Sequence, residues 1–323
     1  MKKIITIGLI LIILTTLTIV NSLNKKNDDK KKITVAEVTH SIFYAPFYVA
    51  LEKGYFEDLD IELVLTSGAN NVVAAVISGD ADIGFCGPEA TIYATLNGNK
   101  DTIKSFAALT KRDGQFLVLR KGIEFNDMSD LEGLTILAGR SGGMPLLNFK
   151  NALKNTNTKN VTIDDSVDFA NLTSAFISGS GDGVNLFEPN ATKLVLEGYG
   201  YIATNIGTYS GVVPYTTFNA SSSFIKENKE VINTFYKGIE KGLKFVKENN
   251  ATTIKDAIKN QFKETSDEEL ITMIDNYKKA DSWYTTPKLI SSDFTNLQDI
   301  MIDNKEIKKY VDFNTLVHVV NID

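Results

Sequence analysis

The chain has 323 residues, of which 43% are hydrophobic and 23% are charged, and its formal net charge is −6. That length suffices for two domains with separate cores, and the acidic balance with scattered Lys and Arg residues argues against a nucleic-acid partner. The single cysteine, Cys86, excludes a disulfide framework, and the two histidines, His40 and His318, leave little for a zinc site or a Ser-His-Asp triad. We therefore assign no metal site, no cofactor and no catalytic residue.

The first 22 residues indicate export. Two lysines precede an apolar run at 4–20, which is typical of a signal peptide or a short membrane anchor. Val20 and Ser22 are candidate small residues before a cleavage site, and the absence of a following cysteine excludes a lipobox lipoprotein. Lysines at 25, 26 and 30–32 oppose this interpretation by the positive-inside rule. We expect an exported protein at the extracytoplasmic face of the membrane, anchored or released, with 23–32 as a flexible tether.

From residue 33 onward, short apolar strands alternate with amphipathic helices, which is typical of an α/β protein with mostly parallel sheets. A first pass predicts strands at 33–38, 61–66, 81–86, 103–110 and 115–122, with helices at 46–53, at 70–78 and from 88. A second pass predicts strands at 134–139, 161–167, 182–187, 201–207 and 212–221, with helices that open at 140–145, end near 177 and restart at 189.

The remainder of the chain is mostly helical and has no sheet of its own. It carries 3.6-residue apolar periodicity over 224–249, 251–263, 266–281 and 287–303, so it must pack on an existing lobe. We expect lobe 1 at 33–120, lobe 2 at 121–214, and a return to lobe 1 at 215–323. The two crossings, near Lys121 and Tyr215, would form a hinge.

One pattern occurs twice, a hundred residues apart. ISGDADIGFCGPEATI begins at Ile77, and ISGSGDGVNLFEPNAT begins at Ile177. Both are interpreted as a helix end, a strand and a helix start. The alternative is chance similarity, because Gly at helix ends and Pro at helix starts are common to all α/β units. In either case strand ends meet helix starts, whose free N–H groups favour ligand binding in the crevice between lobes.

Three blocks of sequence carry a family resemblance. They are THSIFYAPFYVALEKGYFEDLDIELV at 39–64, SGDADIGFCGPE at 78–89 and LFEPNATKL at 186–194. Together they resemble extracytoplasmic solute-binding proteins of ABC importers, in the branch that handles nitrate, sulfonates, taurine and thiamine-pyrimidine precursors. The resemblance implies a two-lobe periplasmic-binding-protein type II fold, in which each lobe is a mixed, mostly parallel sheet flanked by helices and the C-terminal tail is helical. It also implies a monomer that delivers a small molecule to a membrane permease with its ATPase, without chemistry.

The matched blocks supply candidate ligand contacts in lobe 1. Ser41, Phe43 and Tyr44 precede the first helix, where helix capping and core filling are the alternative roles. Gly87, Pro88 and Glu89 stand at the next helix start, where Glu89 is equally suited to complement the helix dipole.

Further candidates lie in loops and in lobe 2. Arg112 and Asp113 form a charged pair in TKRDGQF, for which a solvated cluster is the alternative. GRSGGMP at 139–145 offers an anion cradle formed by Arg140, Ser141, Gly142 and Gly143, without the spacing of a nucleotide-binding loop.

Glu188 bears on the kind of ligand. A carboxylate there repels nitrate or a sulfonate unless a cation offsets its charge, whereas it can hold an aminopyrimidine through a ring N–H and an amino group. Phe43, Tyr44, Phe187 and Tyr215 can sandwich a flat ring. The sequence therefore favours a thiamine-precursor pyrimidine as the ligand. The sulfonate, taurine or nitrate alternative stays open, because an acidic residue before proline also occurs in anion binders of the family.

Two other functions occur on the same fold. An enzymatic branch of the family carries a histidine where Tyr44 stands, and a CCCFC motif where this chain has GVVPYTT at 211–217. Both departures, together with the export signal, predict that the protein is not an enzyme. A ligand-sensing surface protein would have the same lobes and stays an alternative.

Overall fold

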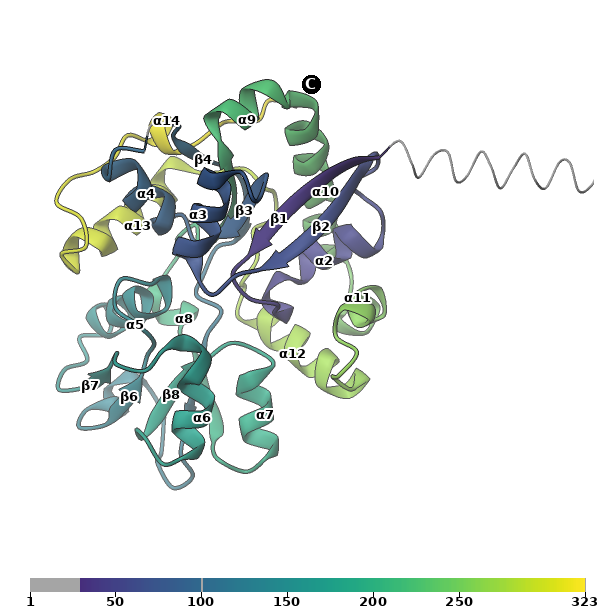
Figure 1. Ribbon diagram of the computed structural model, residues 1–323. Helices are drawn as coiled ribbons and strands as arrows, with labels where there is room; N and C mark the ends of the chain where they lie inside the picture. Colours follow the sequence, from purple (N-terminus) through teal and green to yellow (C-terminus); the bar gives the residue numbers. More distant parts are fainter. Residues whose placement is uncertain (1–29, 100, 323) are drawn as a thin grey trace, which may run out of the picture.

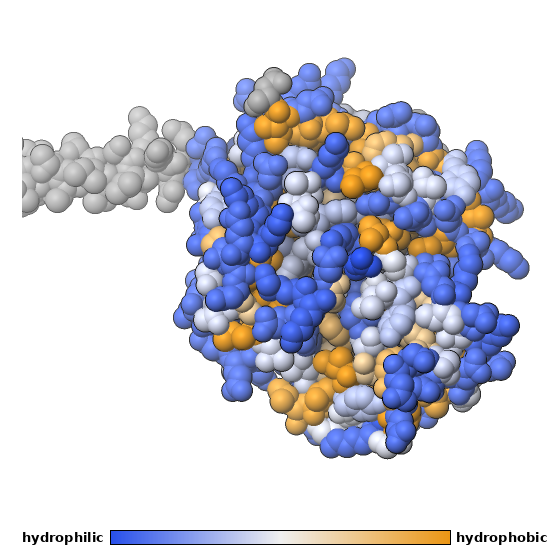
Figure 2. Space-filling view, turned by 180° about the vertical axis from the view of Figure 1, so that it is seen from behind, coloured by the Kyte–Doolittle hydropathy of each residue, from blue (hydrophilic) through white to orange (hydrophobic). Residues whose placement is uncertain are grey.

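The computed structural model describes residues 30–99 and 101–322. The expected signal peptide or anchor at 1–22 lies outside these residues, as does most of the expected tether at 23–32. Lys31 and Lys32, the last residues of that tether, instead begin strand β1. None of the helices within the described ranges is long and apolar enough to cross a membrane. The face shown in Figure 2 is mostly hydrophilic, with hydrophobic side chains scattered among the polar ones.

Lobe 1 is the part of the chain built on the first sheet, whose strand order is β2-β1-β3-β10-β4 (Figure 1). Strands β1, β2 and β3 are parallel, whereas β10 is antiparallel to both of its neighbours. The strands are β1 (Lys31–Glu37), β2 (Leu59–Leu65), β3 (Ile83–Cys86), β4 (Ile103–Thr110) and β10 (Thr216–Ser221). The accompanying helices are η1 (Ile42–Tyr44), α2 (Ala45–Glu52), α3 (Ala69–Ser78) and α4 (Glu89–Leu96).

Lobe 2 is built on the second sheet, with strand order β7-β6-β8-β5-β9. Strands β6, β7 and β8 are parallel, and β5 is antiparallel to β8 and β9. The strands are β5 (Phe116–Leu119), β6 (Thr135–Leu137), β7 (Thr162–Asp164), β8 (Gly183–Leu186) and β9 (Tyr201–Asn205). The helices are η2 (Met128–Leu131), α5 (Met144–Asn155), η3 (Phe169–Asn171), α6 (Leu172–Ile177), α7 (Asn190–Leu196) and α8 (Gly207–Ser210). Both lobes therefore have the expected mixed, mostly parallel sheet with flanking helices.

The position of β5 differs from the expectation. The sequence predicts residues 115–122 as the end of lobe 1, with the boundary between 120 and 121, but β5 pairs within the second sheet. The first crossing therefore runs through residues 111–115. All four residues of β5 are apolar and buried, and such a strand carries no mark of the sheet that it joins.

The second crossing, residues 206–215, lies beside the first and ends at Tyr215, where a crossing was expected. Val213 N donates to Lys111 O at 3.1 Å, and Ile206 N donates to Gln115 O at 2.9 Å. Two short segments, bonded to each other, thus join the lobes.

The repeated pattern has the same contacts in both lobes. Asp82 Oδ2 accepts a hydrogen bond from Thr34 N at 2.9 Å, and Asp182 Oδ2 accepts one from Thr135 N at 2.8 Å. The backbone N–H of each aspartate donates to the carbonyl of the same threonine. In each lobe the aspartate lies directly before one strand (β3 or β8) and is bonded to a threonine of the parallel neighbour (β1 or β6), so the prediction of a structural repeat is confirmed.

The C-terminal helices pack mainly on lobe 1, as expected, and also touch lobe 2. They are α9 (Ser222–Glu227), α10 (Lys229–Glu248), α11 (Ala251–Ile258), η4 (Lys259–Gln261), α12 (Asp267–Lys279), α13 (Ser291–Asp303) and α14 (Phe313–Leu316). Helix α10 crosses α2 closely at Gly242, where an added Cβ would lie 2.1 Å from Pro46 O. Helix α13 reaches lobe 2 through the ion pair between Asp303 and Lys154 of α5.

Candidate functional site

An aromatic cluster lies where the two lobes meet. Phe43, just before α2, is completely buried, and its ring centroid is 5.4 Å from that of Phe187, 5.7 Å from Tyr215 and 5.2 Å from Tyr277. Tyr44 packs against Phe43 as well. We call these five residues the boundary aromatic cluster. The structure thus brings together the four aromatic residues predicted from the sequence and adds Tyr277 of α12.

Hydrogen bonds hold this cluster across the boundary. Ser41 caps η1 by accepting from Phe43 N, and its hydroxyl donates to Glu188 O of lobe 2 at 2.7 Å. Glu188 N donates to the Tyr277 hydroxyl at 3.0 Å, and Trp283 Nε1 donates to Phe43 O at 2.7 Å. Ser41 therefore joins the lobes in addition to capping a helix.

The first crossing passes directly over Phe43. An added Cβ at Gly114 would lie 2.4 Å from the Phe43 ring, so only glycine allows this approach. Gly114 was not predicted as a site residue, because a single glycine in a loop has the same appearance whether it serves a turn or a close contact.

The Glu188 carboxylate is occupied by its own chain. Its two oxygens accept hydrogen bonds from the backbone N–H of Thr192 at 2.9 Å, from the Thr192 hydroxyl at 2.8 Å and from Asn276 Nδ2 at 3.1 Å. Burial raises the pKa of Glu188, although these bonds act in the opposite direction. Its predicted contact with a ligand stays a prediction, and the structure gives the carboxylate a role in joining α7 to α12.

Glu89, at the equivalent helix start of lobe 1, is in a different state. Its side chain is 4% exposed, and Oε2 has no hydrogen-bond partner. Burial raises the pKa of Glu89 to about 7, although the positive charge of Arg140 and the N–H groups of Ala90 and Met144 lower it. Gly87 makes room for this side chain, since an added Cβ there would lie 2.1 Å from Glu89 Oε2. Pro88 is the N-cap of α4.

Asp113 of the first crossing is fully buried. One carboxylate oxygen accepts from Gln115 N at 2.7 Å, while Oδ2 has no partner. Burial raises the pKa of Asp113 well above its usual range. The hydroxyl of Tyr215 is close enough to affect that pKa, yet it too lacks a partner with hydrogen-bond geometry.

Buried carboxamides continue this polar region into lobe 2. Gln115 Nε2 donates to Asn185 O at 3.2 Å, and Asn205 Nδ2 donates to Gln115 O at 2.9 Å. Gln115 Oε1, Asn205 Oδ1 and both polar side-chain atoms of Asn185 are unpartnered, as is Oδ1 of the buried Asn148 on α5. None of these four amides was predicted from the sequence. The available signal was a polar residue on an otherwise apolar element, as in GVNL of β8.

The remaining predicted residues lie at the edge of this region. Arg112 pairs with Asp281 at 3.7 Å and donates to Gly207 O at 3.4 Å. Arg140 and Ser141 are exposed, in the loop before α5. Gly143 is the N-cap of α5, and Gly142 O accepts from the Tyr93 hydroxyl at 3.2 Å. The anion cradle predicted for 139–145 stays a prediction.

Sequence comparison identifies the family. The family model described as NMT1/THI5 like matches residues 42–252, which is more than half of the chain. The chain belongs to this family. The matched range includes the boundary aromatic cluster except Tyr277, and both crossings.

One relative and two solved structures are similar to this chain. A protein of Bacillus subtilis (strain 168) described as "Putative binding protein YtlA" is 40% identical over 299 residues, covering 91% of this chain and 90% of the relative. The ligand-binding component of an ABC-type import system from Staphylococcus aureus has a TM-score of 0.72 at 15% identity, with 90% of this chain and 97% of that chain covered. The periplasmic aliphatic sulphonate binding protein SsuA from Escherichia coli has a TM-score of 0.68 at 15% identity, with 89% and 97% covered. The NMT1/THI5-like chain therefore has the periplasmic-binding-protein fold.

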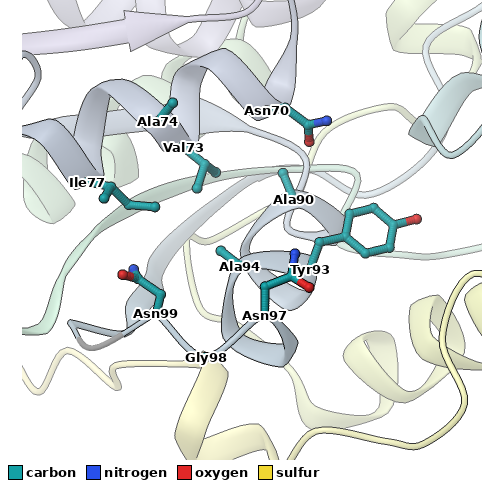
Figure 3. A pocket seen from close by; sticks show the side chains of 10 residues that line it. All are labelled: Asn70, Val73, Ala74, Ile77, Ala90, Tyr93, Ala94, Asn97, Gly98 and Asn99. Carbon is teal, nitrogen blue, oxygen red and sulfur yellow. The ribbon is translucent and has the colours of Figure 1, made fainter.

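A surface cavity of about 720 Å³ lies between α3 and α4 of lobe 1 (Figure 3). Its lining is mostly small and apolar, with Val73, Ala74 and Ile77 on α3 facing Ala90 and Ala94 on α4. It lies outside the boundary between the lobes, and Tyr93 is the lining residue that reaches lobe 2, through Gly142. The site between the lobes is the better candidate, because it combines aromatic rings with unpartnered polar atoms.

Proposed function

We propose that this NMT1/THI5-like protein is the extracytoplasmic solute-binding component of an ABC-type importer. It captures one small molecule between its two lobes and delivers it to a membrane permease with its ATPase, without catalysing a reaction. The observation that carries this proposal is the set of buried, unpartnered polar atoms beside the boundary aromatic cluster. Buried polar groups normally have partners, so unpartnered ones gathered at one boundary favour a ligand site.

Two ligand classes are compatible with the family. A thiamine-precursor aminopyrimidine is our first choice, since the rings of Phe43, Phe187 and Tyr215 suit a flat heterocycle. An alkanesulfonate, taurine or nitrate is the alternative, supported by the sulphonate-binding neighbour SsuA. The N-terminal apolar run supports export. Export is compatible with both ligand classes and does not discriminate between them.

A ligand panel tests the proposal. The full chain is screened by thermal shift against small heterocycles and oxyanions, and hits are measured by calorimetry and small-angle scattering. We expect at least one compound to raise the melting temperature, to bind with 1:1 stoichiometry and to make the protein more compact. A panel in which no compound changes the melting temperature would count against a solute-binding role.

A further inference from the structure

The segment 139–145 of lobe 2 is in contact with lobe 1. The hydroxyl of Tyr93, whose ring projects outward from α4 in Figure 3, donates to Gly142 O at 3.2 Å. Arg140 reaches the N-cap of α3, since its Nη2 would lie 3.8 Å from an added Cβ at Gly68. These contacts join the two lobes in addition to the two crossings.

Glu89 lies beside this contact. Residues four apart lie on the same face of a helix, so Glu89 of α4 faces the same segment as Tyr93. An added Cβ at Gly87 would lie 2.1 Å from Glu89 Oε2 and 2.8 Å from Cγ of Met144, the first residue of α5, which lies below α4 in Figure 1. The N–H of Met144 is also close enough to lower the pKa of Glu89. Lobe 2 therefore contributes to the burial that leaves Glu89 4% exposed.

Separation of the lobes would return the Glu89 carboxyl to water. With the lobes in contact, Oε2 has no hydrogen-bond partner, and a buried carboxyl without enough donors favours its neutral form. With α5 moved away, the carboxyl would stand in water in the first turn of α4, where the N-terminal end of a helix favours the charged form. The closed and open arrangements of the lobes therefore differ in their affinity for a proton at this one side chain.

We propose that closure of the two lobes takes up a proton on Glu89, so that acidic conditions favour the closed form and the lobes open as the pH rises. Glu89 is in this sense a positioning residue, because it acts on solute capture through the distance between the lobes. The inference rests on the proposed function, since capture between lobes requires that they open and close.

The direction of the pH effect follows from the two states of the carboxyl. The pKa of Glu89 is about 7 in the closed form, against an ordinary value of 4.5. The preference for the closed form is therefore fully present below about pH 4.5 and is lost as the pH rises through about 7.

Other groups surround Glu89 or share the boundary with it. Arg140 favours the ionised carboxyl, and Glu306, which follows α13, lies 3.3 Å from the Tyr93 hydroxyl. Four groups that interact electrostatically with Glu89 have pKa values that burial raises out of its titration range, namely Tyr44, Cys86, Tyr93 and Tyr215. Asp113 and Glu188 are buried acids of the same boundary, and burial raises the pKa of each. A test must therefore separate Glu89 from these two acids.

The test measures the separation of the lobes without any solute. The single cysteine, Cys86, is buried, so spin labels can be attached selectively to the exposed positions of Ala74→Cys on α3 and Ala170→Cys on η3. Pulsed electron paramagnetic resonance gives the distances between the labels in the full chain at pH 5 and pH 8. We expect the ratio of closed to open protein to fall by about tenfold to a hundredfold between these pH values.

Two variants assign the proton to Glu89. Glu89→Gln cannot ionise, so it should stay closed at both pH values and lose the pH dependence, which a merely structural role would not remove. Arg140→Gln removes, at an exposed position, a positive charge that lowers the pKa of Glu89, so it should enlarge the change with pH. This second variant keeps the test valid if Glu89→Gln does not fold. Asp165→Asn, at an exposed position of lobe 2, is the matched control and should respond to pH as the wild type does.

Two results would overturn the inference. Label distances that do not change between pH 5 and pH 8 would show that closure takes up no proton. The same pH dependence in folded Glu89→Gln as in the wild type would assign the proton to Asp113, Glu188 or another group. Because the measurement uses no solute, either result leaves the proposed function standing. Failure of the ligand panel would count against the proposed function without changing the pH dependence of closure.

Discussion

The two copies of the repeat differ most at their helix starts. In lobe 1 the sequence is Gly87-Pro88-Glu89, and the Glu89 carboxyl is buried with one oxygen unpartnered. In lobe 2 it is Phe187-Glu188-Pro189, and the Glu188 carboxylate accepts three hydrogen bonds from Thr192 and Asn276. Both acids lie at the boundary between the lobes.

This difference separates an acid whose carboxylate is hydrogen-bonded within the chain from an acid that keeps an unpartnered oxygen. Glu188 stabilises the start of α7 and joins it to α12. The hydrogen bonds of its carboxylate are therefore already made within the chain. Glu89 is buried at a net cost, which burial of a carboxyl imposes unless donors compensate for it. A repeat can thus place two acids in corresponding positions and give them opposite roles, and the neighbours of each acid decide which role it has.

The largest expected effect is that of Glu188→Ala on stability. Removing the carboxylate leaves the Thr192 N–H and hydroxyl and the Asn276 amide without their acceptor. We expect the free energy of unfolding to fall by about 2–4 kcal/mol, as for loss of several buried hydrogen bonds to a charged group. Urea unfolding followed by circular dichroism measures this loss.

The same experiment can break the comparison. If Glu188→Gln retains wild-type stability but loses ligand binding, Glu188 is a recognition residue, as the sequence predicts, and the two copies share one role.

The second expected effect concerns Glu89 and pH. Its pKa is about 7 in the folded protein, against an ordinary value of 4.5. The folded state therefore binds the extra proton, and stability is lost as pH rises from about 4.5 through about 7. Relative to wild type, Glu89→Gln should gain about 1–3 kcal/mol of stability between pH 4.5 and pH 8, because the variant has no carboxyl to ionise.

Other groups with raised pKa values also contribute to the pH dependence of stability, and their contributions cancel when the wild type is compared with the variant. Asp113, whose pKa burial raises, also destabilises the fold as pH rises. The pKa of His40 is raised mainly by its hydrogen bond to Glu37, so its stabilising contribution is likewise lost as pH rises. Both groups are common to wild type and variant. A difference between the two proteins that does not change with pH would show that Glu89 keeps an ordinary pKa.

Much of the fold could be predicted from the sequence, because the spacing of apolar residues and the Gly and Pro residues at the ends of elements are local signals. The strand at 103–110 matches β4 residue for residue, and the helix stop at Gly79 is a left-handed C-cap, as a glycine after an apolar face predicts. The sheet to which β5 belongs could not be predicted. Its partners β8 and β9 follow it by some 65 to 85 residues, and pairing over such separations is decided by packing.

The candidate site was predicted less completely. Phe43, Tyr44 and Phe187 were predicted because they precede helix starts, where α/β folds place ligands, whereas Tyr215 was predicted from its place at the second crossing. Asn185 and Gln115 were missed because single amides within apolar elements also occur as satisfied core residues. The state of Glu188 depends on Asn276, 88 residues away, which no local pattern reveals.

The smallest expected effect concerns the part of the repeat that is equal in both lobes. Asp82 and Asp182 are both half-buried, and each accepts one backbone N–H, from Thr34 and Thr135. Asp82→Asn and Asp182→Asn should each lower the free energy of unfolding by about 0.5–1.5 kcal/mol, since an amide oxygen still accepts the bond without the charge. Urea unfolding of the two variants tests whether the losses match. Equal losses would place the divergence of the two copies at the helix starts alone, whereas a clearly larger loss at one aspartate would show that the lobes already differ where the strands begin.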